Sequence, residues 1–292
     1  MQHRFWKYEA LGNDYLVLDP ASWGEGAPPP AAAIRRLCDR HFGLGSDGIL
    51  WGPLPAAGAL CGLRIFNPDG SEAEKSGNGL RIFARFLLDS GRARAAAPFQ
   101  VNTLGGVVEC RVLAGGGRVR VGMGRVSFRS GDIPVAGEDR ETLHETTLVG
   151  SPMTPIIFCA ASVGNPHCVV LNPPTVDEAT ARRLGPLLET HPLFPKRINV
   201  QFLQVLDRHA IRIEIWERGA GYTLASGSSA SAAAAAACKL GLCASPVRVR
   251  MPGGDLEVEV APDFQVVQTG PVRAVASGEA AADLLAALAG EG

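Results

Sequence analysis

The sequence has no excess of charge of either sign, no long apolar run and no CxxC pair. Its 28 basic and 29 acidic side chains give a formal net charge of -1, which argues against a nucleic-acid partner because phosphate binding leaves a basic excess. The longest apolar run is Ala232–Cys238, and a membrane span needs about 18 to 20 residues. We therefore expect neither a membrane partner nor a nucleic-acid partner.

The seven cysteines are an odd number at spacings that match no disulfide framework or zinc ribbon. They are Cys38, Cys61, Cys110, Cys159, Cys168, Cys238 and Cys243. The first residues, MQHRFWKYEALGNDY, lack the basic-then-apolar pattern of a secretory leader. These features predict free thiols, no metal site and a reducing, cytoplasmic location.

Apolar residues are plentiful at 46 %, and 292 residues are long enough for two cores. Short β-type segments with glycine punctuation alternate with a few helical patterns. Helices are expected at about 31–40, 80–88, 177–188 and 230–240. The segment 80–88, LRIFARFLL, is apolar nearly all round, which indicates a helix buried within a domain.

The two halves of the chain share a layout. In each half a strand leads into a glycine-containing loop and then a buried helix, and the loops read Ser76-Gly77-Asn78-Gly79 and Ser226-Gly227-Ser228-Ser229. The two serines are 150 positions apart. This repetition predicts two similar lobes, each of which directs a helix N-terminus at one cleft.

A helix N-terminus offers unpaired N–H groups and the positive end of a dipole, so it suits an anion. Two such ends could hold a carboxylate and stabilise negative charge that develops beside it. The alternative is that both loops are ordinary helix caps, since serine is among the best capping residues. The recurrence of flanking glycine in both halves favours the binding site.

Several other polar residues stand at turns or strand ends. Asn13, Asn67, Asn165 and Asn199 each lie at a turn or a strand start, where an asparagine alone is a turn former. Glu217 and Arg218 end a strand just before the second glycine-rich loop, and His167 begins a strand after Asn165-Pro166. Lys75 directly precedes Ser76, and taken alone it is a solvated charge.

Taken together, these segments resemble the diaminopimelate epimerase family. The resemblance rests on ALGNDY, RHFGLGSDGIL, FNPDGSEAE, SGNG, VGNPHCVV, LGPLLETHPLFP, INVQF, WERGAGYT and SGSSASAAAAAA, in family order from about residue 3 to 278. It implies an α+β fold of two pseudo-symmetric lobes, each with a β-barrel-like, mainly antiparallel sheet around a central helix. The lobes are expected at 1–127 plus 272–292 and at 128–271.

The resemblance also implies cofactor-free chemistry on a small amino-acid or dicarboxylate substrate, in a homodimer. One residue would remove the α-proton of the substrate and a second would return a proton to the other face. The family positions that contact substrate correspond to Asn13, Asn67, Asn165, Asn199 and Arg218, and the backbones of Gly77-Asn78 and Gly227-Ser228 would bind the α-carboxylate. His167 and Glu217 match the groups placed beside the two catalytic residues.

The chain departs from the family where the chemistry is done. The family's two catalytic bases are cysteines, and the matching positions are Ser76 and Ser226. A thiol has a pKa near 8.5 that a helix N-terminus lowers, whereas an alcohol needs a strong neighbouring base. Lys75, Tyr222 and Gly48 are further departures, while Cys168 is expected to be core packing.

Three hypotheses follow from this pattern. The first is a diaminopimelate epimerase-like isomerase that acts through the two serines. The second is a divergent member that uses another base, Lys75 or His167, on a different substrate. The third is a homologue that binds an amino acid or dicarboxylate without turnover, whether the serines are natural or introduced by design.

Overall fold

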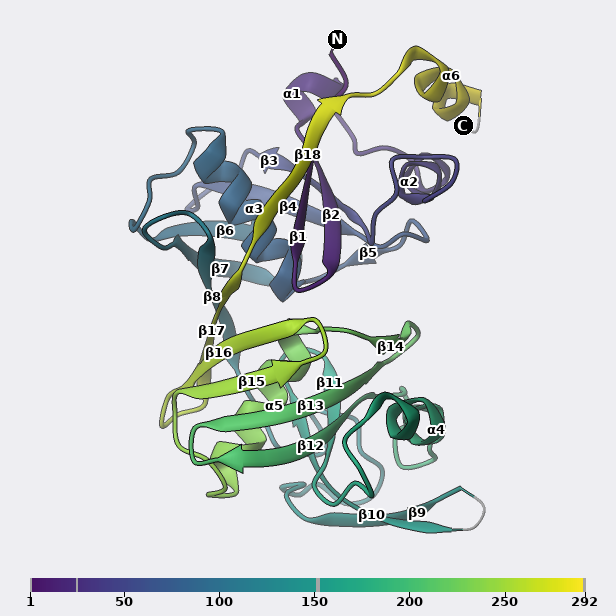
Figure 1. The fold of residues 1–292 in the computed structure, drawn as a ribbon, viewed down its shortest axis with the longest axis vertical. Helices are drawn as coiled ribbons and strands as arrows, with labels where there is room; N and C mark the ends of the chain where they lie inside the picture. The colour runs from purple at the N-terminus through teal and green to yellow at the C-terminus, as the bar shows by residue number, and fades with distance from the viewer. Residues whose placement is uncertain (1, 25, 151–152, 291–292) are drawn as a thin grey trace. The chain divides into compact units, whose positions relative to one another are not determined.

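The computed structural model describes residues 2–24, 26–150 and 153–290, and Figure 1 shows its elements. The chain forms two compact units, 1–121 with 270–292 and 122–269. The chain passes from one unit to the other within strand β8 (Arg118–Arg125) and returns within β17 (Gln265–Pro271). Each unit therefore has its own run of strands and its own buried helix.

Unit 1 is a mixed sheet with a buried helix. Its strands are β1 (Arg4–Ala10), β2 (Asn13–Leu18), β3 (Ile49–Leu54), β4 (Cys61–Phe66), β5 (Glu72–Ala73), β6 (Phe99–Thr103), β7 (Gly106–Val112) and β18 (Arg273–Glu279). Its helices are α1 (Pro20–Trp23), α2 (Ala31–Cys38), α3 (Gly77–Asp89) and α6 (Ala282–Gly290). The strands pair in the order β18-β1-β2-β3-β4-β6-β7-β8, and β5 pairs with β4.

Unit 2 repeats this arrangement. Its strands are β9 (Glu145–Val149), β10 (Thr154–Ser162), β11 (Pro166–Val170), β12 (Asn199–Asp207), β13 (Ala210–Glu217), β14 (Gly221–Thr223), β15 (Val247–Met251) and β16 (Gly254–Val260). Its helices are α4 (Glu178–Glu189) and α5 (Gly227–Lys239). The strands pair in the order β9-β10-β11-β12-β13-β15-β16-β17, and β14 pairs with β13.

The two units agree in strand direction as well as in order. From β1 to β7 the successive pairs are antiparallel, parallel, antiparallel, parallel and antiparallel, and the pairs from β10 to β16 follow the same sequence. In both units a short strand, β5 or β14, is followed directly by the buried helix. The predicted α+β class with a mainly antiparallel sheet in two similar parts is confirmed.

The core of each unit surrounds its central helix. In unit 1, α3 packs on β1, β2 and β7, and Leu80, Phe83 and Phe86 on it are fully buried. In unit 2, α5 contacts six strands, β10 to β13, β15 and β16, and its alanines 232–237 are fully buried. Because alanine is small, this helix lies close to all of these strands at once, and the packing remains dense.

The central helix of unit 2 begins earlier than the sequence pattern predicted. The apolar run indicated a start at Ala230, but the helix starts at Gly227 because the Ser226 side chain caps it. The predicted helix 80–88 likewise starts at Gly77, after the cap Ser76. In each loop the first serine is thus the N-cap, and the three residues after it, 77–79 or 227–229, belong to the first turn of the helix.

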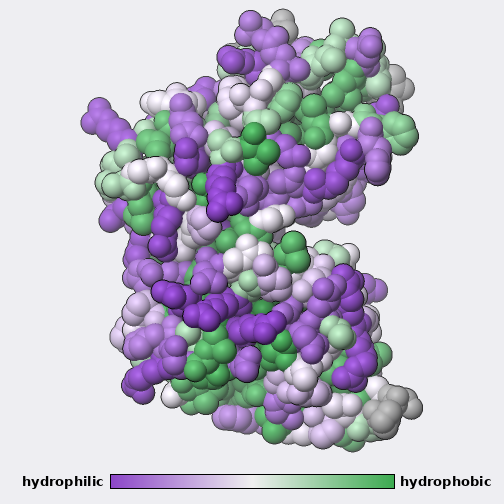
Figure 2. Space-filling view, viewed as in Figure 1, coloured by the Kyte–Doolittle hydropathy of each residue, from purple (hydrophilic) through white to green (hydrophobic). Residues whose placement is uncertain are grey.

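The face of the unit 2 sheet that bears charge is opposite to α5. Arg248 and Arg250 on β15 and Glu257 on β16 are exposed, while the residues between them are buried. Hydrophilic residues cover this part of the molecule in Figure 2.

Within the described residues, none of the helices combines the length and the apolar character needed to cross a bilayer.

Candidate active site

Ser76 caps α3 with its side chain. Its backbone is extended (φ -137°, ψ 119°), and its Oγ accepts a hydrogen bond from the Gly79 N–H at 3.0 Å. The Tyr15 hydroxyl lies 3.3 Å from the same oxygen. Ser76 therefore has a backbone donor and a second hydroxyl as neighbours.

Gly48 provides the space for Tyr15. A Cβ at Gly48 would lie 2.6 Å from Tyr15 Cε1 and 2.4 Å from the Phe66 carbonyl oxygen, and the φ of +158° also disfavours a side chain. A residue larger than glycine would push the tyrosine ring away from Ser76. The contact between Tyr15 and Ser76 therefore depends on a glycine at position 48.

The predicted site residues Asn13 and Asn78 are joined by a side-chain hydrogen bond. Asn78 Nδ2 donates to Asn13 Oδ1 at 3.1 Å, and Asn13 Nδ2 donates to Asp47 Oδ2 at 2.9 Å. Asn67 lies in the turn after β4, where its Nδ2 donates to the Ser71 hydroxyl at 3.0 Å. The structure therefore connects two of the three predicted asparagines of unit 1 directly and places the third within its own turn.

Ser226 caps α5 in almost the same geometry. Its backbone has φ -143° and ψ 125°, and its Oγ accepts from the Ser229 N–H at 3.4 Å and lies 3.4 Å from Ser228 Oγ. Glu217 is close enough to the Ser226 hydroxyl for that group to influence its pKa. Burial raises the pKa of the Glu217 carboxyl, and hydrogen bonding by the Ser226 hydroxyl would offset part of that rise.

His167 is fully buried and both of its ring nitrogens have partners. Nε2 lies 2.9 Å from Asn165 Oδ1, and Nδ1 lies 3.1 Å from Gln201 Nε2. Burial lowers the pKa of the imidazole to about 3, and the Arg218 charge lowers it further. The ring is neutral at pH 7, and an Nε2–H tautomer satisfies both bonds as assigned.

A hydrogen-bonded chain connects His167 with Ser226. Asn165 Nδ2 donates to Ser228 Oγ at 3.4 Å, and Ser228 Oγ is the neighbour of Ser226 Oγ. Gln201 extends the chain at the other end, because its Nε2 also donates to Ser229 Oγ at 3.0 Å. Four predicted residues of unit 2 are thus brought together around the start of α5.

Asn199 and Arg218 lie at the edge of this group. Asn199 Nδ2 donates to the Pro166 carbonyl at 2.8 Å, and its Oδ1 accepts from the Arg218 N–H at 3.0 Å. Asn199 therefore connects the backbone at the start of β11 with the loop after β13. The Arg218 side chain is exposed, and its Nη1 donates to the Lys196 carbonyl.

The other residues singled out in the sequence have different surroundings. The pKa of Lys75 is lowered, because the effect of burial is larger than the opposite effect of the nearby Cys110. The Tyr222 hydroxyl donates to Glu214 at 2.8 Å, and its ring lies under the Arg182 guanidinium. Cys168 belongs to the core of unit 2 with 0 % exposure, as predicted.

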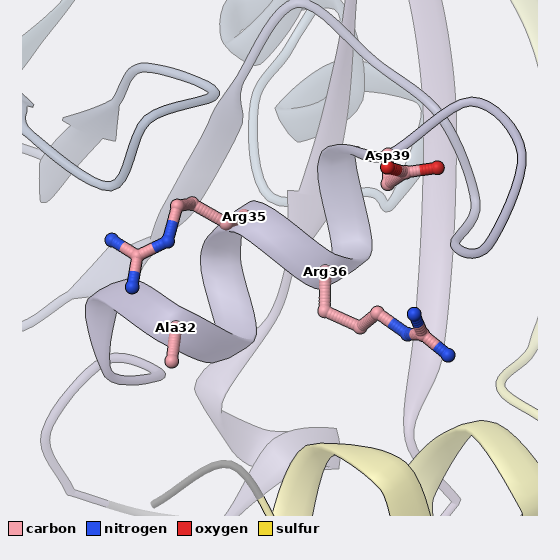
Figure 3. Close-up of a pocket in the computed structure, with 4 residues that line it drawn as sticks. All are labelled: Ala32, Arg35, Arg36 and Asp39. Carbon is pink, nitrogen blue, oxygen red and sulfur yellow. The ribbon is translucent and has the colours of Figure 1, made fainter.

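A hollow on the surface of α2 involves none of the predicted site residues. It is lined by Ala32, Arg35, Arg36 and Asp39, whose side chains Figure 3 shows along one helix. The Arg35 and Arg36 guanidinium groups extend in opposite directions from the helix in this view. The hollow lacks the convergent polar groups that a small-molecule site needs.

A family comparison matches most of the chain. The family model described as diaminopimelate epimerase matches residues 5–129 and 159–275. The chain belongs to the diaminopimelate epimerase family. Diaminopimelate epimerase 2 of Nostoc sp. is 53 % identical over 97 % of this chain and 97 % of its own length. Diaminopimelate epimerase of Moorella thermoacetica is 41 % identical over 94 % and 98 %.

Solved structures share the fold at low identity. A hydroxyproline epimerase from Agrobacterium vitis, solved with trans-4-hydroxy-L-proline, is 18 % identical with a TM-score of 0.69 over 96 % of this chain and 92 % of its own. A probable proline racemase from Agrobacterium radiobacter has a TM-score of 0.67 at 18 % identity over 96 % and 93 %. These likenesses support the fold of this diaminopimelate epimerase family member.

Four polar neighbours of the site were not anticipated from the sequence. They are Tyr15, Asp47, Arg81 and Gln201. Arg81 and Gln201 stand between apolar neighbours in the segments LRIFARF and NVQFL, and a polar residue within a mostly apolar run was the available sign. Tyr15 and Asp47 reach their partners over 61 and 34 positions, which no local pattern reveals.

Proposed function

We propose that this chain is an isomerase that inverts the configuration at an amino-acid α-carbon without a cofactor, converting LL- to meso-diaminopimelate. This product is a precursor of lysine and peptidoglycan. The observation that carries the proposal is the repeated cap geometry, in which Ser76 and Ser226 stand at helix N-termini with backbone dihedrals that differ by only a few degrees. Membership of the family and the name of the 53 % identical Nostoc relative support the substrate.

The α-carboxylate would bind to backbone N–H groups at the two helix N-termini. Gly77 and Asn78 in α3, and Gly227 and Ser228 in α5, are first-turn residues whose N–H groups have no partner within the helix. The dipole of each helix favours a negative charge at this end. The same donors would stabilise the charge that develops when the α-proton leaves.

We propose that Ser226 acts as the proton acceptor together with Glu217. The hydroxyl oxygen takes the α-proton while its own proton passes to the Glu217 carboxylate, so the serine remains neutral. An alcohol requires such a partner because its pKa is far above that of a thiol. Solvent then removes the proton from Glu217.

Ser76 would return a proton to the carbanion. Its hydroxyl gives up the proton and regains one from solvent through the Tyr15 hydroxyl, which lies 3.3 Å away. The reverse reaction uses the same groups in the opposite order. In this proposal the two serines occupy the positions of the two family cysteines.

A second candidate function is binding without turnover. It is favoured by the contacts of the hydroxyls and of His167, because each serine oxygen already accepts a backbone cap bond and both imidazole nitrogens are bonded. In that case Asn13, Asn67, Asn165, Asn199 and Arg218 would hold an amino acid or dicarboxylate that is not converted.

Exchange in D₂O separates these functions. The protein is incubated with LL- and with meso-diaminopimelate, and α-deuterium incorporation and configuration are followed by NMR and chiral chromatography. Epimerisation with exchange supports the isomerase, while saturable binding without exchange of either isomer supports the second candidate. A product of altered connectivity would indicate that another substrate and reaction belong to this site.

The double variant Ser76→Cys with Ser226→Cys is the matched control. Because a thiol at a helix N-terminus has a lowered pKa, we expect it to exchange the α-proton at least as fast as the wild type. If neither the double variant nor the wild type exchanges or binds diaminopimelate, this substrate is wrong.

We also propose that the chain acts as a homodimer in a reducing, cytoplasmic compartment. β18 pairs with β1, and its residues are exposed along most of its length, with Val275 55 % exposed. A strand edge of this kind is a surface on which a second copy can pair. Separately, the seven free thiols support the proposal of a reducing, cytoplasmic compartment. Sedimentation velocity at micromolar concentration tests the dimer, and a monomeric species throughout would contradict it.

A further inference from the structure

Arg81 is a buried cation beside Asn78, one of the predicted substrate-binding residues of unit 1. It lies on the second turn of α3 with 0 % exposure, and its Nη2 donates to Asn78 Oδ1 at 2.6 Å. Within the described part of the chain, its Nε and Nη1 have no hydrogen-bond partner. Burial lowers the pKa of the guanidinium to about 9, and Glu9 acts in the opposite direction, so the side chain is charged at pH 7.

Such a position does not favour stability. A buried cation that leaves two of its donor atoms without partners costs free energy relative to an apolar residue of similar size. The helix around it supplies apolar neighbours, including the fully buried Leu80 and Ile82. The contact with Asn78 is therefore the feature of Arg81 that an apolar residue could not reproduce.

Arg81 stands at one end of a hydrogen-bonded chain that has a single direction. A guanidinium can only donate, so Asn78 must turn its oxygen to Arg81 and its nitrogen to Asn13. Asn13 must then turn its oxygen to Asn78 and its nitrogen to Asp47. An ionised carboxylate can only accept, so Asp47 closes the chain in the same direction.

Asp47 is itself held in place. Its Oδ1 accepts from Arg40 Nη2 at 2.7 Å, and its Oδ2 also accepts from the Asp14 N–H at 3.1 Å. A donor-only group and an acceptor-only group thus fix both ends. The two asparagine carboxamides between them cannot rotate by 180° without losing hydrogen bonds at both ends.

We propose that Arg81 is a positioning residue that fixes the orientation of the Asn78 and Asn13 carboxamides for substrate. The proposal rests on the proposed function, because these asparagines belong to the substrate-binding positions. Arg81 is out of reach of solvent and acts through Asn78 rather than by contact with the substrate. A purely structural arginine would instead support the fold alone.

The test compares Arg81→Met with Arg81→Lys. Methionine fills similar space but cannot donate, whereas lysine retains a donor-only head. For Arg81→Met we expect KM for diaminopimelate to rise roughly 3- to 10-fold, which corresponds to the loss of about one hydrogen bond. The change in kcat should be smaller. We expect the midpoint of urea unfolding to stay the same or rise, because a buried unpaired charge has been removed. Arg81→Lys should show a smaller increase in KM.

A readout independent of turnover is the exchange of the asparagine side-chain amide protons. In ¹⁵N-Asn-labelled protein, Arg81→Met should speed the exchange of the Asn78 and Asn13 Nδ2 protons about tenfold or more. Arg85→Met is the matched control, one turn further along α3, where the guanidinium bonds Asp89 and the Gly116 carbonyl. It should change neither KM nor the Asn78 and Asn13 exchange.

The outcomes separate the two proposals. Unchanged amide exchange in Arg81→Met, or a lower urea midpoint with unchanged KM, would overturn the positioning role. Wild-type protein that neither exchanges nor binds diaminopimelate would overturn the proposed function. In that case the amide exchange still decides whether Arg81 orients the two asparagines.

Discussion

His167 shows how a single residue can connect the stability of the fold to pH. Its pKa is lowered to about 3, chiefly by burial, so the folded protein holds the ring neutral while the unfolded chain protonates it below about 6.5. The unfolded state therefore binds one proton more between these values. The stability contributed by the neutral ring is fully present above pH 6.5 and is lost as the pH falls towards 3.

Replacing this histidine should make the free energy of unfolding depend less steeply on pH in the acid range. Between pH 6 and pH 4, wild-type stability should fall more steeply than that of His167→Gln, by up to about 1.4 kcal/mol per pH unit. Urea unfolding at pH 6, 5 and 4 measures the slopes. His41→Gln, at an exposed position, is the control variant. Equal slopes for wild type and His167→Gln would show that the buried ring is not the acid-sensitive group.

In the proposed mechanism, proton transfer through Ser226 depends on Glu217. Glu217→Gln keeps the shape of the side chain but cannot accept the serine proton, so we expect kcat for α-proton exchange to fall by at least about 100-fold. Substrate binding should change little. Time-resolved ¹H NMR in D₂O measures the rate of exchange, and calorimetric titration measures substrate binding. Wild-type exchange in Glu217→Gln would exclude Glu217 from proton transfer.

The pH dependence of exchange should report the raised pKa of Glu217. The carboxyl must be ionised to accept a proton, so the rate should fall as the pH drops through its pKa. Because burial raises that pKa, the acid limb should lie at higher pH than the value near 4.3 of an ordinary glutamate. A limb at or below 4.3 would contradict the assignment.

At the scale of elements, the proposed mechanism gives the Ser226 helix cap a chemical role beside its contribution to stability. Ser226 caps α5 and Asp177 caps α4 through a 2.7 Å bond from the Thr180 N–H. Either change to alanine should cost about 1 kcal/mol of stability, since each removes the acceptor for an N-terminal donor. Only Ser226→Ala should also abolish exchange. Equal exchange in the two variants, measured beside their urea midpoints, would reduce Ser226 to an ordinary cap.

The elements were largely predictable because their patterns are local. The strand 210–217 follows from alternation, and the predicted helix 177–188 matches α4 to within one residue at each end. The starts of α3 and α5 were each predicted three residues late. The early start of α5 was missed because Gly227 and Ser228 have weak helix propensity and Ser226 overrides it. Gln201 could not be assigned partners, since His167 on β11 and Ser229 in α5 come near it only in the folded chain. Arg81 bonds Asn78 only three positions away, but the full burial of its side chain depends on the rest of unit 1.

At the scale of the whole molecule, the pairing of strands shows a duplicated design. The connections β2-α2-β3 and β11-α4-β12 occupy the same place in the two units, as do β5-α3-β6 and β14-α5-β15. The sequence suggested this through the two serine loops alone, because the remaining identity between the halves is weak. The similar halves explain how one chain presents the same capped helix N-terminus twice.

The distribution of thiols over the whole chain gives a further prediction. Six of the seven cysteines are buried, and Cys238 is partly exposed. A thiol reagent should therefore modify about one cysteine in the native protein and all seven in urea, as counted by mass spectrometry. Native protein treated with iodoacetamide should retain its exchange activity, because the proposed proton carriers are hydroxyls. Loss of activity in proportion to labelling would place a cysteine in the reaction.

The hydroxyl oxygens of the two capping serines also determine which chemical damage the site can suffer. A low-pKa thiol at a helix N-terminus reacts with hydrogen peroxide to a sulfenic acid and can proceed to irreversible acids. A serine hydroxyl has no corresponding reaction. An isomerase built on Ser76 and Ser226 would therefore continue to work during oxidative stress that inactivates a cysteine-based active site.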